Sequence, residues 1–177
     1  MKIIFLAFLS ITALYSSSLK SEMVKLFKQK QYNQLCTLGF KNFLSIQKDE
    51  EAISLYAFGC LYDDKIDNLA IPVILLKNSK EARANAAYFS TILMQKKLLQ
   101  HSLIDGYKIA SLNLPNTDYI LSNVFHLYSN LKKYKKNSTY FFTDKKNIKI
   151  SYKLYFKKKS IIIEEYYDNI LLKKHTY

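Results

Sequence analysis

Glycine is scarce in this chain, with only Gly39, Gly59 and Gly106 among 177 residues. Glycine-rich phosphate loops need clustered glycines, because their backbone must approach the ligand closely. The sequence has no such cluster, and it lacks the Gly-x-Ser-x-Gly elbow of many hydrolases. These absences exclude nucleotide binding through a glycine-rich loop and leave elbow-type hydrolysis without support.

Histidine is equally rare, and His101, His126 and His175 do not lie three or four residues apart. Such spacings are typical of local zinc sites, so we expect no metal and no cofactor. The acidic residues 49–51 are interpreted as a helix N-terminus, and the aspartates between 63 and 67 as a polar turn without a calcium-loop motif. We therefore expect no enzyme, with one alternative: a catalytic site assembled in space from distant residues.

Arginine occurs once, as Arg83, although the chain carries 27 basic residues and a formal charge of +13. Arginine makes the bidentate contacts that read base edges, whereas lysine acts mainly as a point charge on phosphates. The basicity therefore does not indicate a DNA- or RNA-binding protein, and no nucleic-acid partner is expected.

Long apolar runs are confined to the start of the sequence. Lys2 precedes an uncharged stretch at 3–15 and three serines at 16–18, the arrangement of a secretory signal peptide. We predict a signal peptide over 1–18 and a mature chain from Leu19, with retention as an anchor as the alternative. No later run of 18 apolar residues exists, so we expect no integral membrane segment after cleavage.

Cysteine also occurs only twice, at Cys36 and Cys60. Export would place them in an oxidising compartment, where an even number of cysteines favours a disulfide. They also belong to two helical patterns that are expected to face each other. We predict a disulfide between them, and two buried thiols are the alternative.

From residue 19 to about 132 the apolar residues recur at helical spacing. The clearest example is an unbroken stripe of Tyr32, Leu35, Cys36, Gly39, Phe40, Phe43 and Leu44. Asp49, Ser79 and Thr117 are placed to cap helices that run to about residues 63, 96 and 132. We predict a helical-hairpin domain over 19–132, with six or seven helices joined by short turns.

After a lysine-rich linker at 132–137 the apolar period changes to two. Ile148, Ile150, Tyr152, Leu154 and Phe156 alternate with mostly polar residues, which is typical of a half-buried strand. Further strands are expected at 139–143, 161–167 and 170–176, separated by hairpin turns. We predict a three- or four-stranded antiparallel meander over 138–177 that packs on the helices, and hence an α+β fold.

Two helix-sized fragments resemble tetratricopeptide-like repeats. The spacing Leu55-x-x-Phe58-Gly59-x-x-Tyr62 matches the first-helix pattern, in which a small residue lets a partner helix approach closely. Leu103-x-x-x-Tyr107 with Ala110 and Pro115 resembles the second-helix half, although Leu103 stands where the family has a small residue. The resemblance implies a stacked helix-hairpin scaffold that holds another protein or peptide, and it implies no catalytic residues.

The strand pattern also predicts a basic face. Residues 132–177 carry 13 lysines and four acidic residues. With Ile148 to Phe156 turned toward the helices, Lys149, Lys153 and Lys157 would line the opposite face beside Tyr155. This face is a candidate site for an anionic surface. In the competing interpretation, the lysines keep an exposed sheet soluble and guard its edges.

These patterns lead to an expected function and two alternatives. We expect an exported, periplasmic binding or scaffold protein without catalytic activity, whose partner is another envelope protein or a peptide. A surface-associated or extracellular factor that contacts anionic membrane or glycan through the lysine-rich sheet is one alternative. The other is an enzyme.

Overall fold

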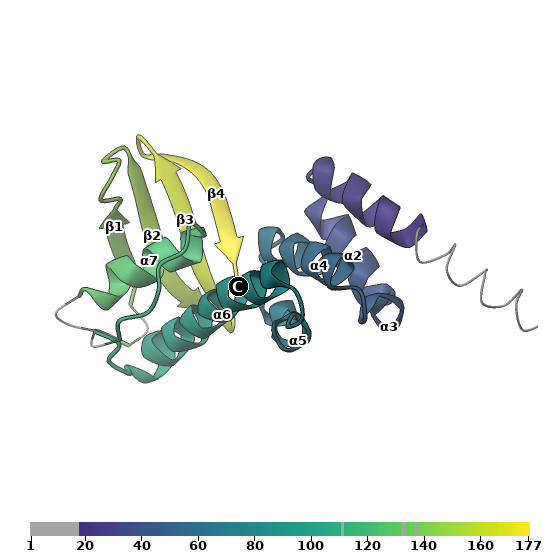
Figure 1. Ribbon diagram of the computed structural model, residues 1–177. Coiled ribbons are helices and arrows are strands. Elements are labelled where there is room, and N and C mark those ends of the chain that lie inside the picture. Colours follow the sequence, from purple (N-terminus) through teal and green to yellow (C-terminus); the bar gives the residue numbers. More distant parts are fainter. Residues whose placement is uncertain (1–17, 111, 132–133, 137) are drawn as a thin grey trace, which may run out of the picture. The chain divides into compact units, whose positions relative to one another are not determined.

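The computed structural model describes residues 18–110, 112–131, 134–136 and 138–177 (Figure 1). The predicted signal peptide, except Ser18, lies outside these residues. The chain forms two compact units that divide between Ala87 and Tyr88. This division lies inside the helix over 80–105, and not at the linker at 132–137 where the sequence placed a boundary. Each unit is described by itself below.

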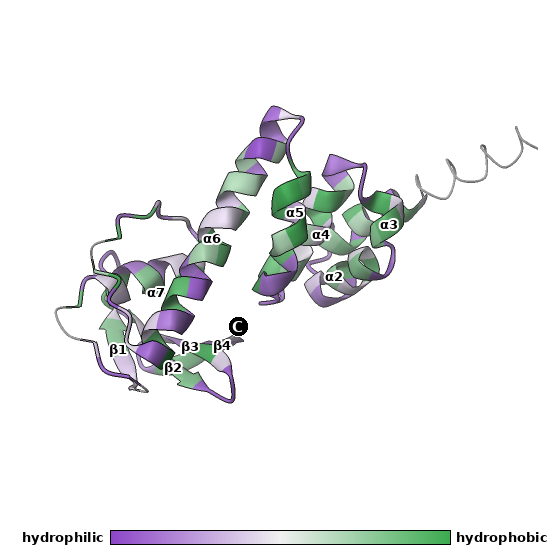
Figure 2. Ribbon diagram, turned by 90° about the horizontal axis from the view of Figure 1, so that it is seen from below, coloured by the Kyte–Doolittle hydropathy of each residue, from purple (hydrophilic) through white to green (hydrophobic). Residues whose placement is uncertain are grey.

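The first unit is helical. Residues 18–28 are helical, followed by α2 (Tyr32–Lys41), α3 (Phe43–Ile46), α4 (Glu50–Tyr62), η1 (Ile66–Leu69), α5 (Ala70–Leu75) and the first turns of α6 (Lys80–Asp105). Apolar residues dominate α4 and α5 (Figure 2). The central α4 buries seven of its 13 residues, because helices pack on it from more than one side.

Helices α2 and α4 pack closely against each other, and two glycines allow their approach. A Cβ atom added at Gly59 would lie 2.7 Å from Leu35 Cγ, and one at Gly39 would lie 2.5 Å from Tyr56 Cδ2. The expectation that Gly59 lets a partner helix approach closely is thus confirmed. A larger residue at either position would force the backbones apart.

The predicted stripe from Tyr32 to Leu44 is only partly buried, and the helix breaks within it. Leu35, Cys36 and Gly39 are buried, but Phe40 and Leu44 are exposed. Helix α2 ends at Lys41, and the side-chain amide of its cap residue Asn42 donates to the carbonyl of Leu38 at 2.9 Å. The break separates Phe43 and Leu44 from the face of α2, whereas Phe40 is exposed within α2 itself.

Two of the three predicted helix caps are confirmed. Asp49 Oδ1 accepts from the backbone N–H groups of Glu51 and Ala52, and Ser79 Oγ accepts from Ala82 at 3.0 Å. The third prediction was wrong in position. Thr117 lies before Tyr119, which precedes α7 (Ile120–Ser129), and its hydroxyl accepts from the N–H of Tyr119. Helix α7 is therefore shorter than predicted. Helix α6 is longer, because it continues to Asp105 and not to about residue 96.

The second unit contains the rest of α6, α7 and one four-stranded antiparallel sheet. The strands are β1 (Tyr140–Thr143), β2 (Ile150–Lys157), β3 (Ser160–Tyr167) and β4 (Ile170–Thr176), in the order β1-β2-β3-β4. This meander and the α+β class confirm the predicted fold. The turns after β2 and β3 have positive φ at Lys158, Lys159, Asp168 and Asn169, as two-residue hairpin turns of this kind require.

One face of the sheet packs on helix α7. Tyr140 of β1 lies edge-on to Tyr128 of α7, with 4.9 Å between ring centroids, and the Tyr128 hydroxyl lies 2.9 Å from that of Ser102 in α6. Leu154 of β2 pairs with Tyr140, Ile163 of β3 pairs with Leu154, and both are buried on the same face. Helix α7 of the same unit therefore covers part of this face of the sheet.

Ile148 departs from the predicted strand alternation. The strand was expected from 148 to 156, but β2 begins at Ile150, and Ile148 lies in the preceding turn with 85% of its surface exposed. The turn is set by Asp144, whose Oδ1 accepts from the backbone N–H groups of Lys146 and Asn147. These local hydrogen bonds end the alternation before it reaches Ile148.

In the part of the chain that the structure describes, no helix combines the length and the apolar character needed to cross a bilayer.

Candidate functional site

An apolar groove of about 420 Å³ opens on the first unit between three helices. Val24 and Phe27 come from the helix that includes residues 18–28, Leu55 and Phe58 from α4, and Ala82 from α6. All four large side chains are half-buried, so the groove offers apolar surface that the fold itself leaves uncovered. A concave apolar surface with a few polar groups is the usual form of a binding site.

An aromatic cluster supports one end of the groove. The rings of Phe27 and Phe58 lie 6.4 Å apart, and Phe58 stacks on Tyr62 at 6.0 Å. Tyr32 completes the cluster at 4.8 Å from Tyr62. Leu55, Phe58 and Tyr62 are large residues of the tetratricopeptide-like spacing, and the first two line the groove. The helical period thus gathers them on one side of α4, while Gly59 meets α2.

Three glutamates, Glu50, Glu51 and Glu81, line the same groove. Glu51 also forms an ion pair with Lys20. This lining is locally acidic in a chain whose formal charge is +13. The groove is therefore suited to an apolar segment that carries positive charge.

Glu50 also holds the loop before α6. Its carboxylate accepts the backbone N–H groups of Asn78 at 2.6 Å and of Lys77 and Ser79 at 2.9 Å. These three hydrogen bonds lower the pKa of the Glu50 carboxyl to about 2. The acidic residues at 49–51 consequently have structural tasks at the start of α4, as the sequence indicated.

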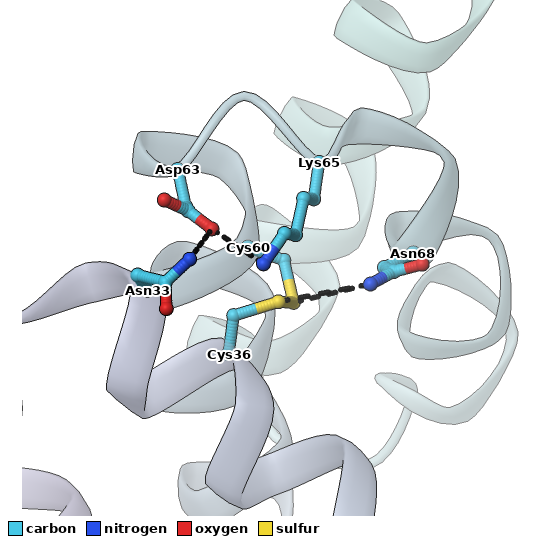
Figure 3. The surroundings of a disulfide bond; sticks show 6 residues. All are labelled: Asn33, Cys36, Cys60, Asp63, Lys65 and Asn68. Atoms are coloured by element: carbon cyan, nitrogen blue, oxygen red, sulfur yellow. Dashed lines mark hydrogen bonds and ion pairs between the residues drawn. A yellow bond between two sulfur atoms is a disulfide. The ribbon is translucent and has the colours of Figure 1, made fainter.

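The predicted disulfide between Cys36 and Cys60 is present. The sulfur atoms lie 2.09 Å apart and join α2 to α4, with the Cα atoms separated by 4.7 Å. Figure 3 shows the Asn68 side chain directed at the sulfur atoms, with its amide nitrogen 3.6 Å from Cys36 Sγ. Both cysteines are buried, so the bridge lies in the core of the helical unit.

Asp63 lies beside this disulfide in a polar turn. Its carboxylate accepts from Asn33 at 3.0 Å and pairs with Lys65 at 2.7 Å (Figure 3). The polar-turn interpretation of the aspartates at 63–67 is thus confirmed for Asp63. The described residues contain no group of three His, Cys, Asp or Glu side chains placed to hold a metal ion.

The predicted basic face of the sheet contains a buried acid. Glu164 of β3 lies opposite Lys153 of β2 and Lys174 of β4 and is only 8% exposed. Its carboxylate lies 3.3 Å from Lys153 Nζ and 3.6 Å from Lys174 Nζ. The hydroxyls of Tyr155 and Tyr166 donate to it at 2.7 and 2.8 Å. A row of alternating charge thus crosses the centre of this face.

The partners of Glu164 fix its charge. Burial alone would raise the pKa of the Glu164 carboxyl, but hydrogen bonds from Tyr155, Tyr166 and Lys153 outweigh it and lower the pKa to about 2. The ammonium group of Lys153 also lies 5.2 Å from the centre of the Tyr155 ring. Two members of the predicted face, Lys153 and Tyr155, therefore belong to one network.

The other two predicted lysines lie at opposite ends of β2. Lys149 precedes the strand, where its ammonium lies 3.4 Å from Asp168 Oδ2 and 5.7 Å from the centre of the Tyr167 ring. Lys157 is exposed at the far end, opposite Ser160. The structure therefore brings Lys153 and Tyr155 together and separates them from Lys149 and Lys157.

The three histidines occupy separate environments in the second unit. His101 stacks on Tyr107 at 4.5 Å, and His175 is buried beside Tyr177. His126 lines an open polar cleft of about 300 Å³ together with Asp144, but its Nε2 lies 3.4 Å from the carbonyl of Pro115. Asp144 accepts hydrogen bonds from the backbone of its own turn.

Sequence reasoning missed both Glu164 and the groove. Glu164 stands in an acidic pair with Glu165, and only cross-strand register shows that it meets two lysines. The groove brings three segments together: its residues on α4 and α6 lie about 30 and 60 positions after those of the first helix. The tetratricopeptide-like spacing in α4 was the one signal that pointed toward it.

Comparison with known proteins adds no assignment: no family model, no curated protein and no solved structure matches this chain.

Proposed function

We propose that this chain is an exported, non-enzymatic binding protein whose helical unit holds a basic, apolar segment of another envelope protein. The groove between the first helix, α4 and α6 carries the proposal. Its half-buried side chains Val24, Phe27, Leu55 and Phe58 supply apolar contact, and its glutamates favour a lysine- or arginine-containing ligand.

Two independent features support export to the periplasm. Residues 1–18 have the charged start, apolar centre and serine-rich end of a secretory signal. The Cys36–Cys60 disulfide would persist in an oxidising compartment and be reduced in the cytoplasm. The two features are separate in sequence, and each supports export from the cytoplasm.

The resemblance to tetratricopeptide-like repeats supports a binding role for the helical unit. In that family, stacked helix hairpins hold peptides or proteins. Here Leu55 and Phe58 of the matching spacing line the groove, while Gly59 supports the helix packing behind it. Binding and packing thus use different sides of α4.

Fractionation with intact-mass analysis tests export. The full chain should be found in the periplasmic fraction with a mass that corresponds to a start at or near Leu19. A product that keeps residues 1–18 and sediments with membranes would mean that the segment is an anchor, and a cytoplasmic product would overturn export altogether.

Crosslinking tests the groove. A photoreactive amino acid at Leu55 should yield crosslinks to basic, apolar segments of envelope proteins, and Glu81→Gln should weaken them at low salt. The matched control is the same amino acid at Leu44, which is exposed in the same unit but does not line the groove. Equal crosslinking from both positions, or products without a basic segment, would contradict the proposal.

A further inference from the structure

Two turns of the second unit form one continuous surface at an end of the sheet. Alternate turns of a meander lie at the same end, and Figure 1 shows the β1–β2 and β3–β4 turns there. The backbone N–H of Asp168 donates to the carbonyl of Lys149 at 2.8 Å, and their side chains form an ion pair. We call residues 145–149 and 167–173 the turn-end surface.

Apolar side chains on the turn-end surface are unusually exposed. Ile148 is 85% exposed, Ile170 69% and Leu172 58%. A β-bulge explains Leu172: Tyr166 pairs with Leu171 while Glu165 pairs with Lys173, so Leu172 is an extra residue in β4. Exposed apolar side chains gathered at one place mark an interaction site more often than scattered ones do.

Lysines surround these side chains. Lys145, Lys146, Lys149 and Lys173 are all exposed, and the two aspartates of these turns are already engaged. Asp144 accepts from the backbone of its own turn and from the Tyr152 hydroxyl at 3.1 Å, and Asp168 pairs with Lys149. Because Asp168 offsets the charge of Lys149, the positive charge around the apolar side chains comes from Lys145, Lys146 and Lys173.

We propose that the turn-end surface binds an anionic lipid bilayer, with Ile148, Ile170 and Leu172 entering the headgroup layer and the lysines contacting lipid phosphates. Charge complementarity selects this partner, since each lysine near an anionic leaflet contributes about 1 kcal/mol. Shape supports it as well. Ile148 lies in a turn, and Ile170 and Leu172 lie at the start of β4 next to a turn, so all three are at the exposed end of the sheet. A fluid headgroup layer accepts such a surface without a matching cavity.

This partner is distinct from the ligand of the groove. It also differs from the predicted basic face, because Lys153 is held by Glu164 at the centre of the sheet. The competing occupant is a second copy of the chain. Strand β4 is an edge of the sheet, and edge strands can pair with one another.

The absence of tryptophan from the chain permits a site-specific test. The full chain with Ile170→Trp carries a single tryptophan on the turn-end surface, so its fluorescence reports this site even if residues 1–17 also bind lipid. Leu44→Trp is the matched control, since Leu44 is a comparably exposed apolar residue of the helical unit. Both proteins are titrated with vesicles of phosphatidylcholine alone and with added phosphatidylglycerol.

The proposal expects a blue shift and acrylamide protection for Ile170→Trp on the anionic vesicles, weakened by high salt. Adding Ile148→Ser with Leu172→Ser should weaken partitioning at least about tenfold. Adding Lys145→Gln with Lys146→Gln should weaken it by about fivefold for each lysine. Circular dichroism checks that each variant is folded.

Three results would overturn the proposal. The first is no shift for Ile170→Trp on anionic vesicles, and the second is an equal shift for Leu44→Trp. The third is a dimer in sedimentation that Ile170→Trp and the serine substitutions disrupt while lipid binding is unchanged, which would assign the turn-end surface to strand pairing.

Discussion

Gly59 of α4 lies directly against Leu35 of α2, so that a Cβ atom added to the glycine would be 2.7 Å from Leu35 Cγ. The same Cβ would lie 3.1 Å from the backbone nitrogen of Cys36. Helix α4 therefore has two roles. It is joined to α2 by this contact and by the disulfide, and it also lines the groove.

Gly59→Ala should therefore destabilise the protein despite the higher helix propensity of alanine. We expect a loss of about 1 to 3 kcal/mol in the free energy of unfolding, measured by urea denaturation, because the added methyl group overpacks the helix contact. In a Leu35→Ala background the same substitution should lower the free energy of unfolding clearly less. Equal losses in both backgrounds would show that Leu35 is not the limiting neighbour.

The disulfide should be formed in protein purified without reductant. Thiol titration should then find no free sulfhydryl in the unfolded chain before reduction and two afterwards. Replacing both cysteines by alanine should lower the free energy of unfolding by about 3.5 kcal/mol, the chain-entropy value for a loop of this length. Two thiols in the unreduced protein would contradict the bond.

Glu164 should make stability depend on pH in the acidic range. Its pKa is about 2 in the folded protein and near the ordinary value of 4.5 when unfolded. The carboxylate therefore stabilises the fold above about pH 4.5, and this contribution is lost as the pH falls toward 2. Glu164→Gln should lower the melting temperature at neutral pH, with a difference from the native chain that shrinks on acidification.

Glu165→Gln is the control for this experiment, because Glu165 is adjacent in sequence and lies on the opposite face of the strand. It should not reproduce the pH-dependent difference. Melting curves followed by circular dichroism between neutral and acidic pH compare the three proteins. A constant difference between the native chain and Glu164→Gln would argue against a lowered pKa of the carboxyl.

Single substitutions can separate the roles of the lysines on the predicted basic face. If it binds anionic polymer, Lys157→Gln should reduce retention on a sulfated matrix at low salt, because Lys157 is exposed. Lys153→Gln should instead lower stability with a smaller effect on retention, since Lys153 is paired with Glu164. Unchanged retention for both variants would leave these lysines with a role in solubility alone.

Local patterns in the sequence determined the class and order of most elements. The change of apolar period from about 3.6 to two near residue 137 separated helices from strands, because side-chain direction repeats with the backbone geometry. The caps at Asp49 and Ser79 and the pairing of Cys36 with Cys60 were equally accessible. Local hydrogen bonds at Asn42 and Asp144 displaced the expected ends of elements by a few residues.

Tertiary structure alone decided which charges and apolar groups meet. The register of β3 between β2 and β4 places Glu164 between two lysines, and a shift of one residue would put Glu165 there instead. The groove exists because three helices distant in sequence leave Phe27 and Leu55 half-buried. Sequence patterns fix which side of an element a residue occupies, whereas contacts between elements depend on long-range packing, which a local period does not encode.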